Sequence, residues 1–179
     1  MEHGYRTIRG AVMGEYVEKK SRFIASVKPV ADEREALEFI QEVKSTHRDA
    51  RHNCFAYEIL SGTIIRRYSD DGEPSGTAGI PILEVIKRKD IQNVIIVVTR
   101  YFGGILLGAS GLVRAYGKAA TAALENSEIV EKKICIETAI ITDYNIHGKL
   151  QNYLLQNQYS VKEVRYTQKV ETILYIKEI

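Results

Sequence analysis

The chain has few cysteines, few prolines and no long hydrophobic run, and each shortage excludes a class of protein. The two cysteines, Cys54 and Cys135, stand far apart, so neither a disulfide framework nor a four-thiolate zinc site is expected. Three prolines rule out collagen-like and proline-rich spacer chains. The longest aliphatic run, Val94–Val98, is far shorter than the roughly 20 residues that span a bilayer, and residues 1–10 lack the apolar segment of a secretory signal. We therefore expect a cytoplasmic protein with no membrane partner.

Neither sign of charge dominates, because 25 basic and 23 acidic residues leave a net charge of +2. The total by itself does not predict nucleic-acid binding, and nothing in it indicates specificity for DNA. The distribution is more informative, because between Val85 and Lys118 six basic residues stand against the single acidic residue Asp90. These six residues are Lys87, Arg88, Lys89, Arg100, Arg114 and Lys118. The middle of the chain is therefore expected to be basic.

The first two thirds of the chain predict an α/β domain. Asp32 and Glu35 resemble a capping box, and apolar residues follow at helical spacing, which predicts a helix over residues 33–46. Ser61-Gly62 predicts the turn of a hairpin. The segment 93–99 is apolar on both faces, as a central strand would be. The other expected elements are strands at 22–27, 53–60 and 63–68, a helix from Pro81 to about Lys89, and a helix at 110–125 capped by Ser110.

After Ser127 a second pattern begins, which predicts a separate small domain. Strand patterns at 132–142, 160–166 and 170–177 surround a helical pattern at 144–158. This β-α-β-β order matches four elements of a ferredoxin-like β-α-β-β-α-β unit, without its last helix and strand. We place the boundary near residues 127–132, which gives domains 1–128 and 129–179.

The glycine-rich loop before the helix at 110–125 is the sharpest local candidate for a binding site. Gly103, Gly104, Gly108 and Gly111 surround the expected helix start, where free N–H groups attract anions. The loop matches neither a P-loop nor a dinucleotide fingerprint. The glycines are explained equally well by tight packing and positive φ. The candidate anion-binding residues are Arg100, Gly103, Gly104, Gly108, Ser110, Gly111, Arg114, Lys118, Lys87 and Arg88.

Other candidates have simpler structural explanations. Asp70, Asp71 and Glu73 form a carboxylate cluster that would suit Mg²⁺ or acid/base catalysis, but the loop DDGEPSGTAG (70–79) favours an exposed, solvated turn. Cys54 lies near two histidines, yet a fourth zinc ligand is missing, and a small buried hydrophobe is the simpler role. We therefore expect no catalytic residues, no metal and no cofactor.

Two long segments, DDGEPSGTAG (70–79) and VVTRYFGGILLGASGLVRAYGKA (97–119), closely resemble the signature of the IMPACT/YigZ family. A His52-Asn53-Cys54 segment is similar as well, and the resemblance covers about residues 17–125. It implies a first domain similar to domain 2 of ribosomal protein S5 and to a domain of translocating elongation factors. It also implies a ferredoxin-like second domain, which in this sequence is incomplete.

The resemblance further implies contact with RNA or the ribosome. Eukaryotic relatives regulate translation by binding the activator of an initiation-factor kinase, through an additional domain that has no counterpart in this sequence. The first hypothesis is therefore a non-enzymatic RNA- or ribosome-binding protein in translation regulation. The alternatives are a small hydrolase or nucleotide-binding enzyme that uses the loop with Asp70, Asp71 and Glu73, and a protein–protein adaptor.

Overall fold

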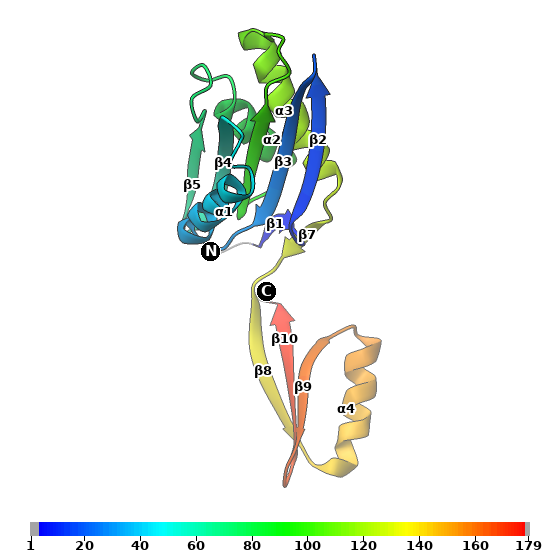
Figure 1. Ribbon diagram of the computed structural model, residues 1–179. Helices are drawn as coiled ribbons and strands as arrows, with labels where there is room; N and C mark the ends of the chain where they lie inside the picture. Colours follow the sequence, from blue (N-terminus) through cyan, green and yellow to red (C-terminus); the bar gives the residue numbers. More distant parts are fainter. Residues whose placement is uncertain (1–3, 178–179) are drawn as a thin grey trace. The chain divides into compact units, whose positions relative to one another are not determined.

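The computed structural model describes residues 4–177, and the chain divides into two compact units. The first unit comprises Tyr5–Lys132 and the second is the chain from Lys133 onward. Each unit has its own sheet, which confirms the prediction of a mixed α/β protein with two domains (Figure 1). Among the described residues, no helix is both long and apolar enough to cross a membrane.

The first unit is built on a five-stranded sheet in which every strand pairs antiparallel to its neighbours. The order is β2-β3-β6-β4-β5. The strands are β2 (Val12–Glu18), β3 (Ser21–Pro29), β4 (His52–Ser61), β5 (Thr63–Ser69) and β6 (Val94–Tyr101). The central position of β6 explains its apolar sequence, because Val94, Ile96 and Val98 pack into one core while Ile95 and Val97 pack into another.

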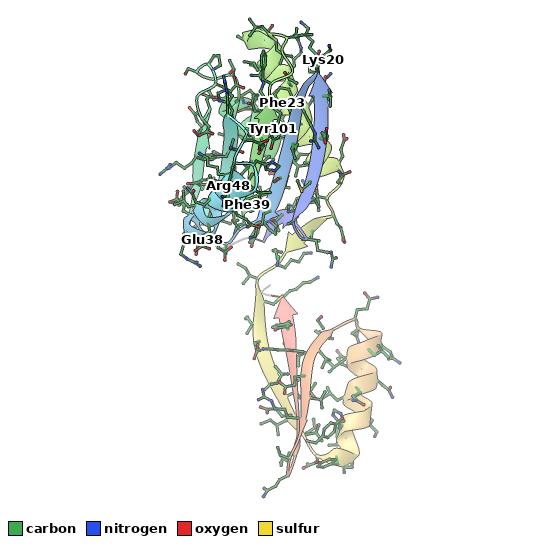
Figure 2. All side chains as sticks on the ribbon, in the orientation of Figure 1. Lys20, Phe23, Glu38, Phe39, Arg48 and Tyr101 are labelled. Carbon is green, nitrogen blue, oxygen red and sulfur yellow. The ribbon has the colours of Figure 1, made fainter. Side chains whose placement is uncertain are left out.

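Three helices enclose this sheet from both sides (Figure 1). Helices α2 (Gly79–Lys89) and α3 (Ala109–Glu125) cover one face and bury the larger core. Helix α1 (Glu33–Thr46) covers part of the opposite face, where Phe39 lies (Figure 2). The predicted start of α1 is confirmed, because the Glu35 N–H donates to the Asp32 carboxylate over 2.8 Å.

A small two-stranded sheet corrects the predicted domain boundary. Strand β7 (Ile129–Lys132) pairs antiparallel with β1 (Tyr5–Ile8), so residues 129–132 belong to the first unit and not to the second. The two ends of the first unit are thus paired with each other. Neither strand was predicted as part of the first unit, because four-residue strands carry too little periodicity to recognise.

The second unit contains three strands and one helix in the predicted β-α-β-β order. Strands β8 (Cys135–Thr142), β10 (Val170–Lys177) and β9 (Ser160–Tyr166) form the sheet β8-β10-β9. Helix α4 (Tyr144–Gln156) follows β8, and its Leu154 is buried together with Val170 and Leu174 of β10. The core of this unit is small, as expected for about 45 residues.

Candidate nucleic-acid interface

The loop at 70–79 is tied to the start of α2 through the Asp70 side chain. The Asp70 carboxylate accepts backbone N–H bonds from Gly76, Ala78 and Gly79 at 2.8, 2.9 and 2.8 Å. Burial opposes its ionisation, but these three hydrogen bonds together outweigh burial and lower the pKa of Asp70 below its ordinary value. Asp70 thus caps a helix whose own N-cap residue, Ala78, has no capping side chain.

Asp71 joins the same loop to β4 and α1. Its carboxylate accepts the Asn53 N–H over 2.7 Å and the Lys44 amino group over 2.8 Å. Its carbonyl lies 2.9 Å from His52 Nδ1, and the neighbouring carbonyl of Asp70 accepts from the Cys54 thiol over 3.0 Å. The structure therefore brings together the two segments 52–54 and 70–79, which the sequence showed only as separate motifs.

Glu73 and Arg100 form a buried ion pair, which corrects two expectations. Arg100 Nη1 donates to Glu73 Oε1 over 2.7 Å, and the side chains are only 8% and 4% exposed. The Tyr116 hydroxyl donates to the same oxygen over 2.8 Å. Glu73 is therefore not in a solvated turn, and Arg100 does not lie on a basic surface, because β6 directs it into the core covered by α2 and α3.

Cys54 is enclosed by this network and is poorly suited to nucleophilic chemistry. Burial raises the pKa of its thiol to about 12, whereas a reactive cysteine needs a lowered pKa. The three carboxylates of the loop engage different partners, and no three His, Cys, Asp or Glu side chains within residues 4–177 are grouped as a metal site. The loop serves as a structural anchor in this arrangement.

The glycine-rich loop connects β6 to α3, and its glycines have packing and conformational roles. A Cβ on Gly103 would lie 2.0 Å from the carbonyl carbon of Lys20, at the end of the β2–β3 hairpin (Figure 2). The Gly103 N–H donates to Ser21 Oγ and is therefore not free for an anion. Gly104 and Gly108 have positive φ values of 83° and 73°. Gly111 is buried against Leu107.

Ser110 does not cap α3, contrary to expectation. The N-cap position is Gly108, and no side chain caps the helix there. Ser110 is the second residue of α3, and its side chain is exposed. The positive φ of Gly108 lets the chain reverse into the helix two residues earlier than the predicted cap.

Three of the predicted basic residues meet on the outside of α2 and α3. Arg88, Arg114 and Lys118 line one surface hollow of about 550 Å³, together with Tyr16 of β2 and Glu125. We call it the basic hollow. Arg114 is exposed and makes no hydrogen bond or ion pair with any residue of 4–177. Lys118 Nζ lies 5.0 Å from the centre of the Tyr16 ring. Lys87 is instead paired with Glu84.

A second hollow of about 430 Å³ lies where β6 ends and β4 begins. We call it the Arg51 hollow. Sequence reasoning named Arg100 and the segment around His52 but missed the hollow, because its lining residues come from two segments that are far apart in the chain. They are Asp49, Arg51, His52, Arg100, Tyr101, Phe102 and Leu106. Arg51 is exposed and unpaired within the described chain, and Phe102 and Leu106 are 57% and 82% exposed.

Fold and site together define a two-domain α/β protein. In its first unit the acidic loop at 70–79 is anchored to β4 and to the start of α2, and helices α2 and α3 carry a basic hollow. Comparison with known proteins gives its class more closely. Residues 19–124 match the model of the Impact N-terminal domain, and residues 140–178 match a domain of unknown function, DUF1949. The chain therefore belongs to the IMPACT family, as the sequence motifs indicated.

Bacterial relatives match this chain over nearly its whole length. The chain is 46% identical over 178 residues to the IMPACT family member YvyE of Bacillus subtilis. The aligned region covers 99% of this chain and 82% of the relative. The chain is 35% identical over 179 residues to an IMPACT family member of Haemophilus influenzae, with 97% and 85% covered. A crystal structure described as that of a hypothetical protein superposes with a TM-score of 0.71 at 30% identity, covering 98% of this chain and 86% of the other.

Proposed function

We propose that this chain is a non-enzymatic regulator of translation that acts in the cytoplasm and contacts RNA, free or in the ribosome, through the basic hollow. Membership of the IMPACT family supports the link to translation, since the family resemblance includes eukaryotic relatives that regulate it. The contact with RNA rests on the geometry of the hollow. Phosphate contacts supply most of the sequence-independent affinity for nucleic acid.

The observation that carries the proposal is the set of three cations around one hollow. Arg114 and Lys118 are one helical turn apart on α3, and Arg88 reaches the same hollow from the end of α2. No carboxylate within residues 4–177 is paired with any of the three. Cations without a protein counterion are available to phosphate oxygens. Tyr16 adds a ring beside Lys118, which suits contact with a sugar or base.

The test is a salt titration of RNA binding with the double variant Arg114→Ala/Lys118→Ala. The expected result is weaker binding to all RNA sequences, with a salt slope that falls by about one unit for each phosphate-binding side chain that the variant removes. The matched control is Arg34→Ala/Arg48→Ala. It removes the same charge from exposed positions in α1 and just after it, on the opposite face of the sheet (Figure 2).

The control decides between a specific contact and a general effect of net charge. If the control variant keeps the parent slope while the α3 variant does not, the proposal is supported. Equal slopes in the parent and a folded α3 variant would contradict the RNA contact. A protein partner captured by the parent with no salt-dependent RNA binding would favour the adaptor alternative.

A further inference from the structure

The Arg51 hollow has no role in the proposed RNA contact, and its chemistry differs from that of the basic hollow. Its lining combines cations, a histidine and exposed apolar side chains, whereas the cations of the basic hollow come from helices α2 and α3. Its volume of about 430 Å³ falls within the range of small-molecule sites. A ligand of this hollow must match all three kinds of group.

Arg51 brings an unpaired positive charge to the hollow, which favours an anion, and Arg100 adds further N–H donors although its charge is already paired with Glu73. Arg51 has no ion pair or hydrogen bond within the described chain. In Arg100 only Nη1 is hydrogen-bonded, to Glu73, and Nε is buried without a partner. The carboxylate of the lining, Asp49, is engaged through Oδ1 by the Tyr101 hydroxyl over 3.1 Å. The planar guanidinium of arginine can donate two parallel hydrogen bonds to a phosphate.

His52 adds a hydrogen-bond acceptor beside these cations. Its Nδ1 lies 2.9 Å from the Asp71 carbonyl, and a carbonyl oxygen can only accept, so Nδ1 carries the proton. In the neutral ring Nε2 is then an acceptor. No hydrogen bond within residues 4–177 uses that atom. A ligand hydroxyl would satisfy it, whereas an ionised phosphate oxygen would not.

The remaining walls are apolar and include an aromatic ring. Phe102 is 57% exposed, and the Arg100 guanidinium lies 5.5 Å from the centre of its ring. Leu106 is 82% exposed in the loop that Gly103 fastens to the β2–β3 hairpin. An exposed ring of this kind stacks on nucleic-acid bases with little dependence on sequence.

From these three features we propose that the Arg51 hollow binds a ribonucleoside monophosphate group. Arg51 and Arg100 contact the phosphate, His52 Nε2 accepts from a ribose hydroxyl, and Phe102 stacks on the base. The group is either a free nucleotide or the terminal nucleotide of an RNA. The site is separate from the basic hollow, so its test does not depend on the proposed function.

The experiment is calorimetric titration of the full chain with 5′-AMP, 2′-deoxy-5′-AMP and inorganic phosphate. We expect 5′-AMP to bind more tightly than either of the others. Arg51→Ala weakens binding of 5′-AMP about ten-fold, as expected for the removal of a charge-assisted hydrogen bond. Phe102→Ala weakens it about as much because the stacking is removed, but leaves phosphate binding unchanged. The control Arg48→Ala removes the same charge near the end of α1 and has no effect.

His52→Ala provides a specific check of the hydroxyl contact. It should remove the preference for 5′-AMP over the deoxynucleotide while leaving binding of the deoxynucleotide unchanged, a result that general loss of folding would not give. A short RNA with and without a 5′-phosphate distinguishes the two sources. Phosphate-dependent RNA binding that disappears in Arg51→Ala identifies a terminal nucleotide, and binding of 5′-AMP alone identifies a free one.

Three results would overturn the proposal. They are no detectable binding of 5′-AMP at millimolar concentration, equal affinity for 5′-AMP and inorganic phosphate, and an equal loss of affinity in Arg51→Ala and Arg48→Ala. If the salt dependence of RNA binding changes in Arg114→Ala/Lys118→Ala but nucleotide binding is absent, the proposed function stands and this inference alone fails.

Discussion

Arg100 Nη1 donates to Glu73 Oε1 over 2.7 Å inside the core of the first unit. The Arg100 guanidinium also lies 5.6 and 5.5 Å from the ring centres of Phe23 and Phe102. The Tyr116 hydroxyl of α3 donates a second hydrogen bond to the same Glu73 oxygen. One carboxylate thereby connects the loop at 70–79 to the central strand β6 and to helix α3, which both come later in the sequence.

Replacing Glu73 should therefore destabilise the fold strongly. Glu73→Gln leaves the buried Arg100 charge without its counterion, and breaking such a pair costs about 3 kcal/mol or more of the free energy of unfolding. Urea unfolding followed by circular dichroism measures the loss. The control is Glu84→Gln, which removes one partner of the exposed pair with Lys87 and should change the free energy of unfolding by less than about 1 kcal/mol. Equal effects of the two variants would contradict the structural role of Glu73.

The Asp70 cap should make the stability of the fold depend on pH in the acidic range. Its pKa in the folded state is lowered, below the value of about 3.9 expected in the unfolded chain. The ionised carboxylate thus stabilises the fold above about pH 4, and this contribution is lost as the pH falls through the folded-state pKa. Asp70→Ala should lower the free energy of unfolding by about 1 kcal/mol at pH 7, with a smaller difference from the parent at pH 3.

The control for this prediction is the same substitution at another helix start. Asp143 occupies the N-cap of α4, but its side chain makes no capping hydrogen bond. Asp143→Ala should therefore have little effect at either pH. A difference between the parent and Asp70→Ala that does not change between pH 7 and pH 3 would contradict the carboxylate cap.

Two glycine-to-alanine substitutions should have opposite effects. A Cβ on Gly103 would overlap the backbone of Lys20, so Gly103→Ala must displace the β2–β3 hairpin or the loop, at a cost of about 1–3 kcal/mol. Gly117 lies inside α3 with no atom within 4 Å of an added Cβ, so Gly117→Ala should stabilise the protein by about 0.5–1 kcal/mol. Thermal melting of both variants gives the two signs, and a stabilising Gly103→Ala would refute the packing role.

The two cysteines should differ sharply in reactivity. Cys135 is exposed, whereas Cys54 is buried and its thiol pKa is raised to about 12. At pH 8 a thiol reagent should therefore modify Cys135 quickly in the native protein and Cys54 only after unfolding. Peptide mapping of the modified protein identifies the residue. Rapid native labelling of Cys54 would contradict the burial and the raised pKa of its thiol.

The sequence by itself determined most of the helices and strands. Asp32 and the apolar spacing that follows it predict α1, and the continuous apolar segment at 93–99 predicts the central strand β6, because local spacing records which side chains will be buried. The order of elements after Ser127 likewise predicts the second unit. These features depend on residues that are close together in the chain.

Tertiary structure alone decided which charged residues are buried in ion pairs and which are exposed. The sequence placed Arg100 with Arg114 and Lys118 in one basic segment, but β6 directs Arg100 to the buried Glu73, while α3 leaves Arg114 exposed. The pairing of β1 with β7 and the assembly of the Arg51 hollow are equally invisible in the sequence. In each case the partners are separated by tens of residues or more. Whether a charged group meets a counterion, solvent or a ligand depends on which distant segment folds against it.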